Sequence, residues 1–157
     1  MKYCGIILIL LTLISCDSNR LYEKNISIDD SVWGLSQTPT FEYANSDTLS
    51  EVNMLINVRH SSTYPFSNLW LFVNTISPNG TPMQDTIECV LAEKNGQWLG
   101  SGLGNIFDIQ CSFKTIRLDD NGIYQFNVEQ AMRHGDLAKI EHLPGIMEVG
   151  LRIEKTN

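Results

Sequence analysis

The chain has 157 residues, of which 43% are hydrophobic and 18% are charged, and its formal net charge at pH 7 is −7. This length suits one domain, and the apolar content excludes a chain that is disordered throughout. The negative charge argues against nucleic acid as a partner, because phosphate binding needs a basic face, and against adhesion to anionic lipid through charge alone.

The first sixteen residues predict a targeting signal and a lipid anchor. A short segment with Lys2 precedes an apolar run, residues 5–14, that has no charged or amide side chain. The run is too short to cross a hydrocarbon core, which takes roughly 20 helical residues, but it suits a signal peptide. The following Leu13-Ile14-Ser15-Cys16 resembles the lipobox of bacterial lipoproteins. This implies that residues 1–15 are removed and that Cys16 is acylated and becomes the new N-terminus.

The next segment, residues 16–30, has two interpretations. It is polar and has no clear period, which is typical of a tether between the lipidated Cys16 and a folded body. The alternative is an edge strand that contains Leu21, Tyr22, Ile26 and Ile28. In either case we expect a single β-sandwich domain over residues 31–157.

From Val52 onward, apolar and polar residues alternate with a period of two. Such runs, bounded by turn residues, predict half-buried antiparallel strands. The run 68–74 is apolar on both sides, which suits a central strand or one whose outer face meets a partner. We expect an all-β antiparallel sandwich, immunoglobulin-like or jelly-roll-like, with about six to nine strands and at most one short helix, Val128–His134. The inward residues are expected to be Val52, Met54, Ile56, Val58, Ile87, Cys89, Leu91, Ile109, Cys111, Phe113, Tyr124, Phe126, Val128, Met147, Val149, Leu151 and Ile153.

Turn residues separate these runs. Pro78-Asn79-Gly80 and Asn95-Gly96 predict tight turns. Asp120-x-Gly122-x-Tyr124 indicates either the tyrosine corner of immunoglobulin-like sandwiches or an ordinary turn before a strand. The glycines at 100, 102 and 104 are followed by neither the lysine nor the helix of a phosphate loop. We therefore expect bulges there, or a close approach of two backbones.

Two of the four cysteines remain for the folded body, because Cys4 lies in the predicted signal peptide and Cys16 is expected to carry the lipid. Cys89 and Cys111 take inward positions on their strands, as a disulfide between two sheets requires. The cell envelope is oxidising and permits such a bridge. Two buried free thiols that pack as small hydrophobic groups are the alternative.

Catalytic and metal-binding motifs are absent from the sequence. It contains no G-x-S-x-G elbow, H-E-x-x-H helix, P-loop or dinucleotide fingerprint. The spacing of His60, His134 and His142 matches no zinc pattern. We therefore expect no enzyme, no metal and no cofactor, and we identify no small-molecule substrate. A hydrolase would require one of these histidines to lie in a cleft beside a carboxylate and a nucleophile.

Aromatic residues are the better functional signal. Tyr64, Phe66 and Trp70 lie close together where a predicted strand begins, and Trp98 follows in a later turn. Rings at the mouth of a strand form binding surfaces for proteins or stack on sugars. The alternative is that they cap the core. These four residues are our candidate partner surface.

Seven short segments then occur along the chain in the order YPFSNLWLFV (64–73), PNG (78–80), DTIE (85–88), GQWLGSG (96–102), QAMR (130–133), LPGI (143–146) and VGLRI (149–153). With CDSN at residues 16–19, they resemble the gliding-motility lipoprotein GldH family of Bacteroidota. The chain departs from the family pattern around Asn105-Ile106, where an Asp-Ile step is expected.

The resemblance implies a non-enzymatic lipoprotein that supports a gliding-motility and type IX secretion-associated assembly through contacts with other envelope proteins. It implies attachment by the N-terminal lipid, with the outer membrane and a periplasmic orientation as the expected location. No catalytic residues are attached to the family, so none are transferred. The alternative function is that of a carbohydrate-binding or general envelope-maintenance lipoprotein.

Overall fold

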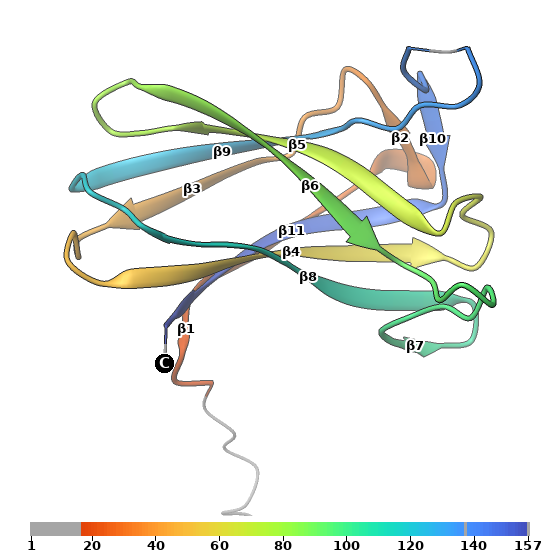
Figure 1. Ribbon diagram of the computed structural model, residues 1–157, viewed down its shortest axis with the longest axis horizontal. Coiled ribbons are helices and arrows are strands. Elements are labelled where there is room, and N and C mark those ends of the chain that lie inside the picture. The colour runs from red at the N-terminus through yellow and green to blue at the C-terminus, as the bar shows by residue number, and fades with distance from the viewer. Residues whose placement is uncertain (1–16, 137, 157) are drawn as a thin grey trace, which may run out of the picture.

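The computed structural model describes residues 17–136 and 138–156, so the predicted signal peptide and Cys16 lie outside the described residues. The strands form an antiparallel β-sandwich (Figure 1), which confirms the predicted fold class. One sheet has five strands in the order β1-β11-β4-β8-β7, and the other has four in the order β3-β9-β5-β6. A two-stranded sheet, β10-β2, lies beside them.

The strand bounds show where the sequence pattern was incomplete. Three strands of only three residues, too short to show a period, bring the described chain to eleven strands, more than the expected six to nine. One 3-10 turn, η1 (Asp29–Ser31), precedes β2. The strands are β1 (Arg20–Ser27), β2 (Val32–Gly34), β3 (Thr40–Asn45), β4 (Glu51–Ser61), β5 (Asn68–Ile76), β6 (Pro82–Val90), β7 (Ser101–Leu103), β8 (Ile106–Arg117), β9 (Gly122–Gln130), β10 (His142–Pro144) and β11 (Ile146–Lys155).

The alternating runs place their apolar side chains between the two large sheets. β4 alternates buried and half-buried residues along almost its whole length, as a strand with one covered face must. β11 has a register shift between Ile146 and Glu148, and Met147 is only half-buried as a result. The largest side chains with no exposed surface include Trp33, Phe41, Phe126, Met54, Ile56, Leu69, Leu71 and Leu151.

The helix predicted over Val128–His134 is wrong. Residues 128–130 complete β9, and 131–133 have no regular structure. β9 pairs there with β5, through Val73↔Val128 and Leu71↔Gln130. A helix of seven residues is too short to be stable by itself, so pairing with a neighbouring strand decides the conformation.

Residues 20–27 form an edge strand, as the second interpretation of this segment predicted, and not a tether. β1 pairs with β11 along the segment from Arg20↔Glu154 to Ser27↔Glu148. The folded domain therefore begins at Arg20 and not at residue 31. Of the described residues of the expected tether, Asp17, Ser18 and Asn19 precede β1, and the backbone N–H of Lys155 donates to the carbonyl oxygen of Asn19 at 2.8 Å.

Two local predictions about turns are confirmed. Tyr124 forms a tyrosine corner, since its Oη accepts a hydrogen bond from the backbone N–H of Asp120 at 3.0 Å. The expected close backbone approach occurs at Gly100 and Gly102, where a Cβ atom would lie 2.2 Å and 2.3 Å from carbonyl oxygens of β8. Only glycine fits these two positions, because β7 and the residues before it lie against β8.

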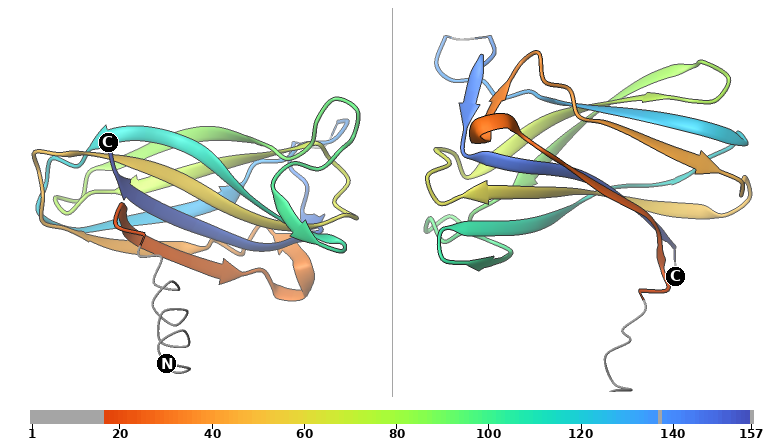
Figure 2. Two further views of the ribbon diagram at one scale, coloured as in Figure 1. Left: turned by 90° about the horizontal axis from the view of Figure 1, so that it is seen from below. Right: turned by 180° about the vertical axis from the view of Figure 1, so that it is seen from behind.

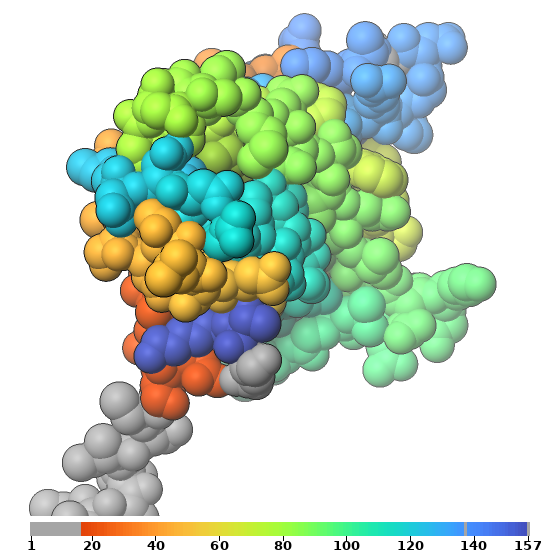
Figure 3. Space-filling view, turned by 60° about the vertical axis from the view of Figure 1, so that its left-hand side comes forward, coloured from red at the N-terminus to blue at the C-terminus, as the bar shows by residue number. Residues whose placement is uncertain are grey.

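The two ends of the sandwich carry different parts of the chain. The described chain begins and ends at the same end, where β1 lies beside β11 (Figure 2). Figure 3 shows that the turns β3–β4, β5–β6 and β8–β9 gather at this end, which we term the anchor end. The opposite or distal end carries the connections 62–67, 91–100 and 131–141 (Figure 1).

Candidate partner-binding site

A groove of about 530 Å³ lies on the outer face of the four-stranded sheet, towards the distal end. Asn68, Trp70 and Phe72 of β5 contribute to its lining, together with Phe66 and residues 131–135. Trp70 is 39% exposed, which is unusual for the largest apolar side chain. We refer to this feature as the Trp70 groove.

The two-sided apolar character of β5 explains why aromatic rings line the groove. Successive residues point to opposite faces, so Leu69, Leu71 and Val73 are fully buried while Trp70 and Phe72 face outward. β5 lies between β9 and β6, which confirms that it is a central strand.

The 131–135 side of the groove is held by a buried glutamine. The side-chain amide of Gln130 donates to the carbonyl oxygen of Ile140 at 2.5 Å and accepts from the backbone N–H of Met132 at 3.0 Å. The N–H of Ile140 in turn donates to the carbonyl oxygen of Met132 at 3.0 Å. One buried side chain thus connects both ends of the 131–140 connection, so its loss would leave backbone groups unpaired.

Two segments that are distant in sequence meet at the groove. The N–H of Ala131 donates to the carbonyl oxygen of Trp70 at 2.8 Å, and the N–H of Trp70 donates to Sδ of Met132 at 3.2 Å. The rings of Phe66 and His134 lie 5.9 Å apart between centroids. The groove is therefore built by the YPFSNLWLFV and QAMR segments together.

The four candidate residues of the partner surface divide into two pairs. Phe66 and Trp70 line the groove, whereas Tyr64 is buried in the core and Trp98 packs against it. The hydroxyl of Tyr64 donates to the carbonyl oxygen of Asn68 at 2.9 Å, and burial raises the pKa of this hydroxyl. Tyr64 and Trp98 therefore pack with the core, whereas Phe66 and Trp70 lie at the groove.

His60 joins this buried aromatic cluster. Its ring centroid lies 4.7 Å from that of Trp98, 5.6 Å from that of Phe107 and 6.0 Å from that of Tyr64. Burial lowers the pKa of His60, and in the neutral ring Nδ1 donates to the carbonyl oxygen of Ser61 at 3.0 Å. His60 thus packs among rings.

The other two histidines lie elsewhere: His134 lines the groove and His142 begins β10. Within residues 17–136 and 138–156, no three His, Cys, Asp or Glu side chains form a group that could hold a metal ion. Over the same ranges, no helix is long and apolar enough to cross a membrane.

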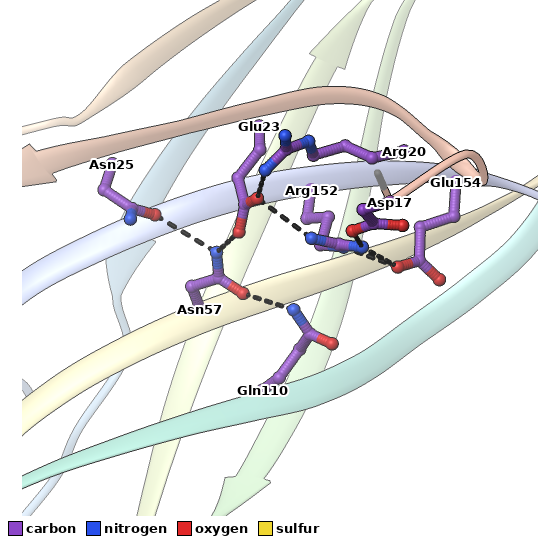
Figure 4. A network of polar contacts seen from close by, with 8 residues as sticks. All are labelled: Asp17, Arg20, Glu23, Asn25, Asn57, Gln110, Arg152 and Glu154. Carbon is purple, nitrogen blue, oxygen red and sulfur yellow. Dashed lines mark hydrogen bonds and ion pairs between the residues drawn. The ribbon is translucent and has the colours of Figure 1, made fainter. Parts of the chain in front are cut away.

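A polar network covers the outer face of the five-stranded sheet near the anchor end (Figure 4). At its centre, the guanidinium of Arg152 on β11 pairs with the carboxylates of Asp17, Glu23 and Glu154. The Arg152 side chain is only 13% exposed. Burial acts against the charge on Arg152, but the three carboxylates raise its pKa. We term this arrangement the Arg152 cluster.

The Arg152 cluster was not predictable from the sequence pattern, because it joins the two ends of the described chain. The hydrogen bond from Arg152 lowers the pKa of Asp17, which is therefore held as a carboxylate on the sheet surface. Glu23 is further bonded by the side-chain amide of Asn57 on β4 at 2.9 Å. Asp17 directly follows the predicted lipid-bearing residue, Cys16, in the sequence.

The fold and the groove together define a β-sandwich domain with an aromatic-lined groove on the outer face of its four-stranded sheet. The chain belongs to the GldH lipoprotein family, which matches residues 20–153. This membership confirms the resemblance seen in the sequence.

Two relatives match over nearly the full length. The gliding motility lipoprotein GldH homolog of Christiangramia forsetii is 36% identical over 91% of this chain and 88% of its own. The gliding motility lipoprotein GldH of Flavobacterium johnsoniae is 33% identical over 98% of this chain and 97% of its own. A family GH115 4-O-methyl-alpha-glucuronidase overlaps 90% of this chain and 18% of its own at 12% identity and a TM-score of 0.43, an overlap from which no conclusion follows.

Proposed function

We propose that this protein is a non-enzymatic lipoprotein of the cell envelope that supports a gliding-motility and type IX secretion-associated assembly by binding a protein partner in the Trp70 groove. The observation that carries the proposal is the groove itself, where two segments typical of the family meet and leave a large aromatic side chain exposed. The relatives' names supply the motility context.

The composition of the groove suits a protein partner. Phe66, Trp70 and Phe72 supply aromatic surface, and Arg133 lies beside them with its side chain exposed. Aromatic residues and Arg are among the types enriched in protein interfaces. We therefore expect the partner to insert an apolar side chain next to an acidic group.

The Arg152 cluster would orient the domain relative to the membrane, and with it the Trp70 groove. We propose that Cys16 carries the lipid and that the ion pair of Asp17 with Arg152 keeps the anchor end close to the membrane. The start of β5 and residues 131–135, which line the Trp70 groove, lie towards the other end of the sandwich (Figure 1). The groove would therefore point away from the bilayer. In an outer membrane, with the protein facing inward, this direction leads into the periplasm.

Changing Cys16 to alanine should release the protein from the membrane and prevent it from restoring motility. Without the sulfur there is no acyl chain, and the acidic protein has no other strong attraction to a bilayer. In a strain that lacks the gene, the measurements are membrane fractionation and colony spreading. Cys4→Ala is the matched control, because Cys4 lies in the predicted signal peptide. Membrane attachment and full spreading with Cys16→Ala would refute the proposal.

A further inference from the structure

Two buried cysteines face each other between the sheets, whereas the groove and the Arg152 cluster lie on the outer faces. Cys89 lies on β6, an edge strand of the four-stranded sheet, and Cys111 lies on β8 of the other sheet. Cys89 is 0% exposed and Cys111 is 9% exposed. Both are free thiols in the structure, and the two side chains interact with each other.

A second contact keeps β6 and β8 together. Nζ of Lys114 on β8 lies 2.6 Å from Oδ2 of Asp85 on β6. Cys89 follows Asp85 along β6, whereas Cys111 precedes Lys114 along β8, so the two strands run in opposite directions past each other. The packing of β6 against β8 therefore brings the two sulfur atoms together. Their proximity does not depend on the conformation of one flexible side chain.

The two thiols are not equivalent. The interaction with Cys111 and burial both raise the pKa of Cys89. Cys111 is also the more exposed of the two. Because the thiolate is the reactive form, Cys111 is the residue that reacts first.

We propose that Cys89 and Cys111 are a redox-active pair that closes to a disulfide between the two sheets when the protein meets a disulfide oxidant. The Cys111 thiolate attacks one sulfur of the oxidant, which forms a mixed disulfide and releases one oxidant thiol. Cys89 then loses its proton, and its sulfur attacks Sγ of Cys111, which releases the second oxidant thiol. The protein loses two electrons and two protons, and the oxidant disulfide gains them as two thiols.

Closure would stabilise the sandwich at an edge. β6 is hydrogen-bonded to β5 alone, so the bond would connect an edge strand to the opposite sheet. The envelope location, which belongs to the proposed function, is needed only as the source of the oxidant. The geometry of the pair is independent of that proposal.

The test is thiol counting on the full-length protein isolated from its own envelope fraction. Cells are quenched in acid, and the denatured protein is treated with a maleimide-polyethylene glycol reagent before and after reduction. We expect no modification at Cys89 and Cys111 before reduction and two modifications after it. The single variants Cys89→Ala and Cys111→Ala serve as controls, with one reactive thiol each. Two free thiols before reduction would overturn closure in the envelope.

A second arm tests the pair without the envelope. Purified protein is incubated with oxidised glutathione, and its melting temperature is measured with and without reductant. We expect an intramolecular disulfide whose reduction lowers the melting temperature by about 10 °C. The variant with both cysteines changed to alanine should show no such difference. Stable glutathione adducts in place of the disulfide would overturn the proposed geometry. If the purified protein forms the disulfide with oxidised glutathione but both thiols are free in the envelope fraction, the result contradicts the proposed envelope location. It does not contradict the redox activity of Cys89 and Cys111.

Discussion

Changing Trp70 to alanine should weaken partner binding at least about thirtyfold and abolish colony spreading, while the fold remains stable. A central tryptophan of an interface contributes about 2 kcal/mol or more when it is truncated. Its ring is 39% exposed, and the bonds that position 131–133 use the backbone of Trp70, so they survive the substitution. The measurements are spreading of the complemented deletion strain, recovery of co-purifying envelope proteins, and the melting temperature.

Ile123→Ala is the matched control for Trp70→Ala. Ile123 lies on β9 of the same sheet, is 59% exposed and is not part of the groove lining. It should leave spreading and partner recovery unchanged. Normal spreading with Trp70→Ala would contradict the role of the groove. Loss of glycan binding with intact protein recovery would instead favour the carbohydrate-binding alternative.

Changing Gly145 to alanine should lower the free energy of unfolding by roughly 2–4 kcal/mol. Gly145 has a φ of 89°, which side chains rarely adopt, and a Cβ there would lie 2.8 Å from Cα of Tyr64. Its N–H donates to Ser31 and its carbonyl accepts from Ser61, both at 2.8 Å. The added methyl group must therefore displace the 62–67 connection, which carries Phe66 to the groove. Chemical denaturation measures the loss.

Gly104→Ala separates the two causes of this effect. Gly104 also has a positive φ, 66°, but a Cβ there would meet nothing within 4 Å. This substitution should cost only about 1 kcal/mol, which reflects the backbone conformation alone. Equal losses for the two variants would show that the close approach to Tyr64 does not contribute.

Short-range patterns in the sequence predicted much of the fold. The period of two located the core faces of β4, β6 and β9, because alternation depends only on neighbouring residues. The tyrosine corner was recognisable because Asp120 and Tyr124 are close in sequence. The apolar run of β5 correctly indicated a central strand, and it pointed to the groove through its outward rings.

Features that depend on long-range contacts were missed. The sequence of residues 128–134 weakly favours a helix, but residues 128–130 pair with β5 instead. This pairing joins residues that are distant in sequence, so no local pattern predicts it. The partnership of Asp17 with Arg152 joins the two ends of the described chain. Similarly, Tyr64 and Phe66 are neighbours of the same chemical kind, yet one is buried and the other lines the groove, because the path of an irregular connection decides where each ring points.

Site-specific photo-crosslinking in the native envelope shows whether the Trp70 groove binds a protein partner. p-Benzoylphenylalanine is introduced in place of Phe72, which lies in the Trp70 groove, and in place of Ile123 as a control on the same sheet. An aromatic group at position 72 preserves the groove, and adducts are identified by mass spectrometry. We expect a discrete envelope-protein adduct from position 72 and none from position 123. No adduct from position 72, or the same adduct from both positions, would contradict partner binding in the groove.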